Sequence, residues 1–430
     1  MKLPKFVRQN LLLKMTSLNA GVISIRLAIS FVIQRLLAET VGEAGISKIG
    51  QLRNLLQMLG SLSSVGVFSG IVKYVSEHQA DKEKLQKLFS TAFVFVTLGS
   101  FVGAGTLLLF SGPISERLFT TRDYAYIIKI VALLLPAVAV YRIFNGVING
   151  LSRYKKLAKI DLVGYLFSSA LLLYCMFTYN IEGVLVAIAV VPVFQICVLL
   201  FIFTKTLRGY VQFSKLRFKV PMAKGLLAFS LMSFFSTILL NYIEIDVRTM
   251  IINKVTESTA GIWTAMTNIS KNYMVFSSAI FSLYVLPKFA GIHSKQGFVN
   301  ELLNIYKTLL PIFALGMVLI YIFRDLVIAL IYPDFTAMGP LFKWQLAGDF
   351  IRLMSVVLAH QFLAKKLVRN FIFTEVLSLA LFYGMAYYLT DIFGVEGVVM
   401  AHFFRYIIYF FVVMLLVMRY FKKKKDTKVG

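Results

Sequence analysis

Apolar runs of about 20 residues recur along this chain, separated by short polar links, and each is long enough for one helix to cross a bilayer. The stretch from Gly183 to Phe203 is almost continuously apolar, whereas a strand of a membrane barrel would alternate apolar and polar residues. Charged residues make up only 15% of the chain, which is too few for an ordinary soluble domain. The sequence therefore predicts an all-α integral membrane protein.

Twelve spans are predicted, and lysine and arginine test that number because they accumulate in cytoplasmic links. The predicted spans are residues 11–38, 47–76, 86–110, 124–151, 158–179, 183–204, 225–250, 259–287, 302–323, 339–362, 370–389 and 396–418. Alternate links and tails on one side, with the adjoining span ends, hold 28 of the 45 basic residues, and those on the other side hold 4. Both termini are therefore expected in the cytoplasm. The net charge of +25 is read as a topology signal and not as a nucleic-acid surface.

A long basic link divides the predicted spans into two sets of six. The expected parts are an N-terminal six-helix lobe (1–205), a cytoplasmic basic linker (206–224), a C-terminal six-helix lobe (225–418) and a basic cytoplasmic tail (419–430). Short tripeptides repeat at equivalent places in the two halves, Ala44 to Ile46 with Ala260 to Ile262, and Glu182 to Val184 with Glu396 to Val398. Such a repeat predicts two lobes around a central cavity.

Several arginines and lysines fall inside the spans, on polar stripes with helical spacing. A cation near the middle of a span, such as Arg26, Lys271 or Arg352, would cost roughly 2.5 to 3.5 kcal/mol if it faced lipid, so it should face water or a partner. A guanidinium binds phosphate oxygens with two parallel donors, so inward arginines suit a diphosphate or uronic-acid cargo. The predicted substrate-binding residues are Arg26, Arg35, Arg53, Arg142, Arg248, Lys271 and Arg352.

Buried ion pairs are the structural alternative for two of these arginines. Glu244 lies four residues before Arg248, and Asp349 lies three residues before Arg352, so each pair shares one helix face. For Arg26, Arg53 and Arg142 no acid lies on the same stripe, so cargo binding is favoured over a partner from another helix. Acids inside spans can also bind a coupling proton or Na⁺. The ion-coupling candidates are Asp349, Asp246 and Asp161.

Enzyme and metal chemistry find little support in the sequence. The two cysteines lie inside apolar spans and the four histidines are scattered, so no cofactor or metal site is predicted. No nucleophile and base occur together, and the outer links are short for a membrane-embedded glycan polymerase or ligase, so no catalytic residue is expected. A drug or cation antiporter would have the same number of spans, but its cavity should be acidic, and here basic stripes outnumber acidic ones.

Several segments resemble those of a known transporter family. They are GEAGISKIGQLRN and GVFSGIVKYVSEH in the second span, GIWTAMTNIS and FSLYVLPKF in the eighth, and FTAMGPLFKWQLAGD leading into the tenth. The chain resembles the Wzx-type lipid-linked oligosaccharide flippases of the MATE and polysaccharide-exporter superfamily. The likeness is greatest to the branch that handles lipid III of enterobacterial common antigen, and it covers nearly the whole chain.

This resemblance implies a fold, a substrate and a set of partners. It implies two six-helix lobes that move an undecaprenyl diphosphate-linked oligosaccharide, an O-antigen unit or lipid III, to the periplasmic face by alternating access. A glycan polymerase and a chain-length regulator are implied partners in polysaccharide and lipopolysaccharide biosynthesis, together with membrane lipids. Arg35, Arg53 and Arg248 fall where that branch is also basic, and Arg26 falls at a lysine. Asp246 falls at an uncharged position, which argues against a shared ion-coupling role there.

Overall fold

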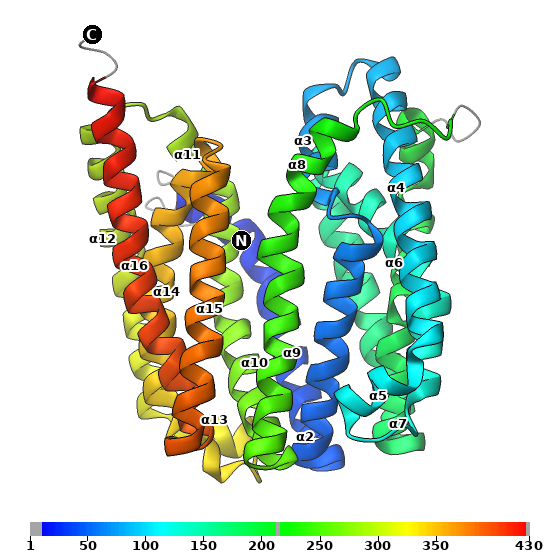
Figure 1. Cartoon of the computed structure of the whole chain (residues 1–430), viewed down its shortest axis with the longest axis vertical. Coiled ribbons are helices and arrows are strands. Elements are labelled where there is room, and N and C mark those ends of the chain that lie inside the picture. The colour runs from blue at the N-terminus through cyan, green and yellow to red at the C-terminus, as the bar shows by residue number, and fades with distance from the viewer. Residues whose placement is uncertain (1–10, 212–215, 427–430) are drawn as a thin grey trace. The chain divides into compact units, whose positions relative to one another are not determined.

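The computed structural model describes residues 11–211 and 216–426 (Figure 1). The predicted basic residues before position 11, part of the predicted linker and the last four residues of the predicted tail lie outside the described residues. Helices dominate the described parts, which contain no strand, so the all-α prediction is confirmed. The helices are α2 (Leu11–Ser63), α3 (Phe68–Glu77), α4 (Lys82–Leu109), α5 (Ser111–Phe119), α6 (Ala125–Gly150), α7 (Tyr154–Tyr210), α8 (Ala223–Ser233), α9 (Leu239–Lys254), α10 (Glu257–Ile280), α11 (Leu286–Gly291), α12 (Lys295–Ile322), α13 (Arg324–Ile331), α14 (Leu341–Ala364), α15 (Val368–Phe393) and α16 (Val395–Asp426).

The prediction of twelve spans is confirmed. Eight helices in the described residues are each long and apolar enough to cross a membrane, counting α8 with α9 as one. The long helix α7 contains two spans, because its backbone breaks at Tyr179 and Asn180, and α2 contains two because it breaks at Gly42. The remaining predicted span, residues 259–287, corresponds to α10 with the start of α11.

The second predicted span, residues 47–76, is interrupted in the structure. Helix α2 ends at Ser63, and α3 resumes at Phe68 at an angle of 50°. Between them Val65 and Gly66 have φ angles of 50° and 64°. A Cβ on Gly66 would lie 2.8 Å from the Cβ of Ser233, so glycine is needed there for its backbone angle and for this close approach.

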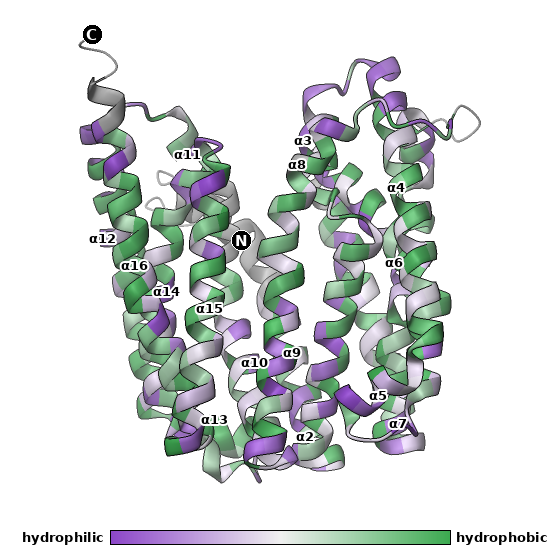
Figure 2. Ribbon diagram, in the orientation of Figure 1, coloured by the Kyte–Doolittle hydropathy of each residue, from purple (hydrophilic) through white to green (hydrophobic). Residues whose placement is uncertain are grey.

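Residues 47–249 pack as one compact unit, here called unit 2. Its apolar core joins α3, α4, α6, α7 and α8, and includes Ile71, Leu88, Val147, Phe203 and Leu226. Figure 2 shows that apolar residues predominate along α4 and α6. Large apolar side chains also point outward, with Phe101 on α4 81% exposed and Phe201 on α7 92% exposed, as expected for surfaces that face lipid.

The described residues of 11–46 and 250–426 pack as a second unit, unit 1, in which α14, α15 and α16 lie side by side (Figure 1). Unit 1 is not continuous in sequence, whereas unit 2 is, and the predicted division into lobes at residues 206–224 stays a prediction. The repeated glycines have matching local roles. Gly397 approaches the Leu389 carbonyl and Gly183 the Cys175 carbonyl, each at the tight turn that opens a span.

Candidate functional site

A hydrogen-bonded polar cluster lies inside unit 1 around Asp349 of α14, whose side chain is fully buried. The carboxylate accepts hydrogen bonds from the hydroxyls of Ser270 and Tyr273 on α10. It also accepts one from the Gln345 amide at 3.0 Å, and His402 Nε2 of α16 lies 3.0 Å from Oδ1. Three helices therefore converge on one buried carboxylate, and its hydrogen-bonding groups are donors.

Two guanidinium groups flank this carboxylate. Arg352 Nη1 lies 3.8 Å from Asp349 Oδ1, so the ion pair predicted from their spacing forms, at the long end of the range. Arg405 Nη2 lies 3.3 Å from His402 Nδ1 and donates to the Tyr406 hydroxyl at 3.2 Å. The Arg405 guanidinium carbon lies 4.3 Å from the Phe382 ring centre and 4.5 Å from that of Tyr406, as in cation–π contacts.

Glycine at position 348 makes this convergence possible. A Cβ there would lie 2.5 Å from His402 Cδ2 and 3.1 Å from the Phe403 Cα. A larger residue would push α16 away from α14 and lengthen the contact between His402 and Asp349.

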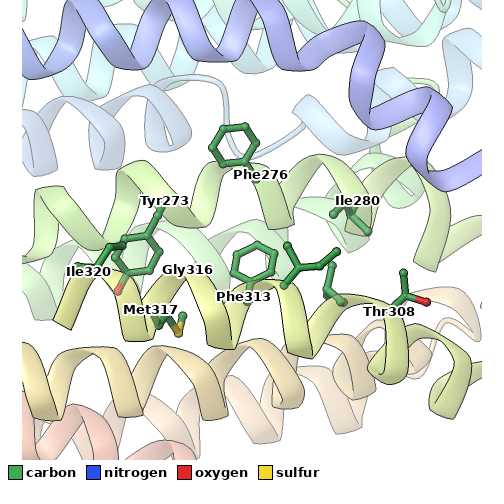
Figure 3. Close-up of a pocket in the computed structure, with 10 residues that line it drawn as sticks. Tyr273, Phe276, Ile280, Thr308, Phe313, Gly316, Met317 and Ile320 are labelled. Atoms are coloured by element: carbon green, nitrogen blue, oxygen red, sulfur yellow. The ribbon is translucent and has the colours of Figure 1, made fainter. Parts of the chain in front are cut away.

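An apolar cavity of about 340 Å³ adjoins the cluster, between α10 and α12. Figure 3 shows Tyr273 and Phe313 facing the same space between these two helices. Tyr273 therefore belongs to both features, because its ring lines the cavity and its hydroxyl donates to Asp349.

A second polar cluster lies inside unit 2, around Arg248 of α9, whose side chain is 1% exposed. Arg248 Nη1 donates to the side-chain oxygen of Gln51 at 3.3 Å and to the Glu244 backbone carbonyl at 3.4 Å. The Glu244 carboxylate accepts a hydrogen bond of 3.0 Å from Asn54, and Gln51 also donates to Thr249 at 3.2 Å. Here the central group is a cation, and the Gln51 amide of α2 and a carbonyl of its own helix hold it.

An ion pair joins α5 to α9 in the same unit. Arg117 Nη2 donates to Asp246 Oδ1 at 2.7 Å, with the Tyr242 hydroxyl 3.4 Å away. The hydrogen bond to Asp246 raises the pKa of the Arg117 guanidinium above its ordinary value, so Arg117 stays cationic. Arg117 and Tyr242 border an otherwise apolar cavity of about 570 Å³ lined by α2, α4, α5, α6 and α9.

The predicted site residues divide between the two units. Unit 1 holds Arg26, Arg35, Lys271, Asp349 and Arg352, and unit 2 holds Arg53, Arg142, Asp161, Asp246 and Arg248. The structure brings Asp349 together with Arg352, and it buries Arg248. Their roles in substrate binding and ion coupling stay predictions.

The remaining cations occupy varied surroundings. The side chains of Arg26 and Lys271 are exposed, and that of Arg53 is half-buried. Arg142 donates to the Gln57 backbone carbonyl at 3.5 Å. Arg35 forms an ion pair of 2.9 Å with Glu39 and donates to the carbonyls of Ala329 and Leu330 at the end of α13, which makes it a capping residue of that short helix.

Sequence reasoning missed His402 as a member of a site. No zinc or haem spacing surrounds it, and its contacts with α14 and α15 come from helix packing. A signal was present on its own span, because Arg405 follows His402 by three residues and shares its helix face.

The described residues define a multi-span, all-α membrane protein with buried polar clusters. A solved structure titled as the inward closed conformation of the lipid II flippase MurJ matches with a TM-score of 0.74 and 13% identity, covering 93% of this chain and 87% of that one. An inward-facing multidrug resistance MATE family transporter matches with a TM-score of 0.70 and 15% identity, covering 92% and 96%. At these identities the likeness shows the fold alone.

Sequence comparison then gives the family. The family model described as polysaccharide biosynthesis protein matches residues 25–335, so the chain belongs to that family. The curated lipid III flippase of Escherichia coli (strain K12) is 28% identical over 389 residues, which cover 90% of this chain and 93% of the relative. The protein of the same name from Shigella flexneri matches to the same extent. The family resemblance noted in the sequence is confirmed.

Proposed function

We propose that this protein is a flippase that moves an undecaprenyl diphosphate-linked oligosaccharide from the cytoplasmic to the periplasmic leaflet of a bacterial inner membrane. The cargo would be lipid III or an O-antigen unit. The observation that carries the proposal is the match over 389 residues to proteins named lipid III flippase, together with a flippase-like fold. A transporter of this kind performs no covalent chemistry on its cargo, so the proposal excludes an enzyme.

Cations inside the spans support an anionic cargo. A charged diphosphate can cross the membrane only if cations or water along its path solvate it. Arginine solvates a phosphate with paired hydrogen-bond donors in a fixed geometry. The proposed substrate-binding residues are Arg26, Arg35, Arg53, Arg142, Arg248, Lys271 and Arg352. Asp349, Asp246 and Asp161 are the proposed ion-coupling residues, in a cycle of alternating access around a central cavity.

Complementation tests the function. The gene should restore glycan display in a strain that lacks the flippase for lipid III or for an O-antigen unit, and the loss of lipid-linked units from the cytoplasmic leaflet measures the activity. Failure in every such strain, despite normal insertion, would contradict the proposal. Export of a cationic dye by reconstituted vesicles, above the rate of empty vesicles, would support the drug or cation antiporter instead.

Two substitutions test the substrate site. Arg26→Ala and Arg53→Ala should each abolish complementation while leaving insertion and abundance unchanged, because each removes a cation from inside a span. Arg122→Ala is the matched control, since Arg122 is 71% exposed and pairs with Glu116 outside the spans. Normal glycan export by both Arg26→Ala and Arg53→Ala would remove these residues from the site.

Membrane orientation and partners complete the proposal. Both termini are proposed to lie in the cytoplasm. A reporter that works only in the cytoplasm should therefore be active when fused to either terminus, and a reporter that works only in the periplasm should be inactive there. A glycan polymerase and a chain-length regulator are the proposed protein partners. Crosslinking in membranes should recover them with this protein, and their absence from the crosslinked products would contradict a stable complex.

A further inference from the structure

The two ring nitrogens of His402 have different neighbours, and these determine where the ring carries its hydrogen. His402 Nδ1 lies 3.3 Å from Arg405 Nη2, and a guanidinium can only donate, so Nδ1 must accept. A neutral imidazole then carries its hydrogen on Nε2, which lies 3.0 Å from Asp349 Oδ1 and donates to it. The two contacts together are satisfied by one neutral tautomer. The Gln345 amide nitrogen lies 3.4 Å from His402 Nε2, but it donates to Asp349 Oδ2 at the shorter distance of 3.0 Å.

Asp349 is held as an acceptor by its surroundings. Ser270, Tyr273, Gln345 and His402 all have a hydrogen to give to its two oxygens, and Arg352 adds a positive charge 3.8 Å away. A protonated carboxyl would have to surrender one of these acceptor positions, and the donor facing it would lose its partner inside the protein. The intact cluster therefore keeps the carboxylate ionised and leaves His402 as its exchangeable group.

We infer that His402 Nδ1 is a proton-binding site, and that the proton and Arg405 exclude each other there. A proton on Nδ1 turns that nitrogen into a donor facing a donor, so the Arg405 contact must break before the imidazolium can form. The imidazolium keeps its Nε2 hydrogen bond to Asp349 and gains the attraction of that carboxylate. The assignment as a coupling site rests on the proposed function, whereas the exclusion rests on the geometry alone.

Arg405 is placed so that it can leave His402. Its other contacts are the Tyr406 hydroxyl and two aromatic faces, and Nε makes no hydrogen bond with the described residues. No carboxylate oxygen in the described residues lies within ion-pair distance of this guanidinium. An anionic phosphate is the chemical class that would compete with Nδ1 for it.

Each helix packed against His402 contributes a charged or titratable group. Helix α14 contributes Asp349 and Arg352, α10 contributes Tyr273, and α16 itself contributes Arg405, Tyr406 and Tyr409. Helix α15 contributes Glu375, which accepts a hydrogen bond of 3.3 Å from Tyr409. An anion that binds Arg405 draws the guanidinium away from His402 Nδ1 and leaves that nitrogen open to a proton. A proton on Nδ1 in turn releases Arg405 for the anion, so the two binding events favour each other.

The chemistry of the cluster suits a proton better than a metal cation. Na⁺, like other hard cations, needs several oxygen ligands, whereas the groups around the Asp349 carboxylate direct N–H or O–H bonds toward it. Changing Na⁺ at constant pH should leave the His402 signals described below unchanged. A chemical shift change with Na⁺ alone would overturn the proton assignment.

Nitrogen NMR of the full chain in nanodiscs, with ¹⁵N-labelled histidine, tests the tautomer. The signals that disappear in His402→Gln should show a neutral ring protonated at Nε2 at about pH 8 and an imidazolium at about pH 5. A neutral ring protonated at Nδ1 would overturn the inference, and so would a ring that does not titrate. His360→Gln is the matched control, because His360 Nδ1 contacts the Val356 carbonyl of its own helix and should leave the His402 signals unchanged.

Adding farnesyl diphosphate tests the linkage. At a fixed pH near the midpoint of the titration, this short isoprenoid diphosphate should raise the ratio of imidazolium to neutral His402 at least about twofold. In Arg405→Leu the ratio should not respond. An equal response in Arg405→Leu and in the unchanged chain would overturn the exclusion, and so would no response in either.

Transport then tests coupling separately. In proteoliposomes the rate of lipid-linked oligosaccharide translocation should vary about tenfold between about pH 8 and about pH 5, and His402→Gln should flatten this profile. A profile that His402→Gln leaves unchanged would overturn the coupling role. No translocation by the unchanged chain would contradict the flippase proposal, while the NMR results would still decide the proton site.

Discussion

The two buried clusters are opposites in charge and in the way that they are held. In unit 1 a carboxylate, Asp349, accepts from side chains of three helices and has two arginines beside it. In unit 2 a guanidinium, Arg248, is held by the Gln51 amide and by a carbonyl of its own helix. The histidine beside the carboxylate can change its charge state, whereas a guanidinium keeps its charge at any working pH. The comparison therefore separates a cluster suited to proton exchange from one suited to fixed anion binding.

Asp349→Ala should have the largest effect on stability. The substitution leaves four donors and the nearby Arg352 without their buried acceptor, so we expect the free energy of unfolding to fall by about 3 kcal/mol. The lower melting temperature of the purified protein in detergent measures it. Asp325→Ala is the control, because Asp325 is 82% exposed. Equal melting of the two variants would show that the Asp349 cluster is not structural.

Gly348→Ala should come next. Its Cβ would meet His402 at 2.5 Å, and such overpacking costs about 2 kcal/mol. Gly384→Ala on α15 provides the comparison, because a Cβ there meets nothing within 4 Å and alanine favours a helix. Melting of both variants in the same detergent tests this, and a stable Gly348→Ala would mean that α14 and α16 separate easily.

Arg248→Met should lower the free energy of unfolding by about 1 kcal/mol, because relief from the desolvation of a buried charge offsets most of the hydrogen bonding that Gln51 and the Glu244 carbonyl lose. Glycan export should nevertheless be lost if this cation binds the cargo. Melting and complementation, measured on the same variant, separate the two roles. A strongly destabilised Arg248→Met would make unit 2 resemble unit 1 and remove the contrast between the clusters.

Arg117→Gln should have the smallest effect, about 0.5 kcal/mol, because the Arg117 side chain is 53% exposed and water screens its pair with Asp246. Because the pKa of Arg117 is raised, the pair is better tested with salt than with base. The difference in melting temperature should shrink in about 1 M salt, where the screening length is about 3 Å. A difference that salt leaves unchanged would indicate packing and not charge.

The sequence predicted the spans far better than the contacts between them. Apolar length identified the helices, and the spacing of Gln345, Asp349 and Arg352 placed all three on one face of α14. That face meets His402 and Tyr273, which lie on helices distant in sequence, and no periodicity within one span shows which neighbour it will have. The interruption between α2 and α3 was missed for a related reason, since Val65 has no turn propensity and only Gly66 hinted at it.

Val65 also has a consequence for the energy of unit 2. A β-branched residue in the left-handed region carries roughly 1 to 3 kcal/mol of backbone strain, which the packing around it must outweigh. A straight second span would not carry this energy. The bend between α2 and α3 therefore stores strain energy in the folded protein, and the close packing of Gly66 against Ser233 is a contact that maintains the bend.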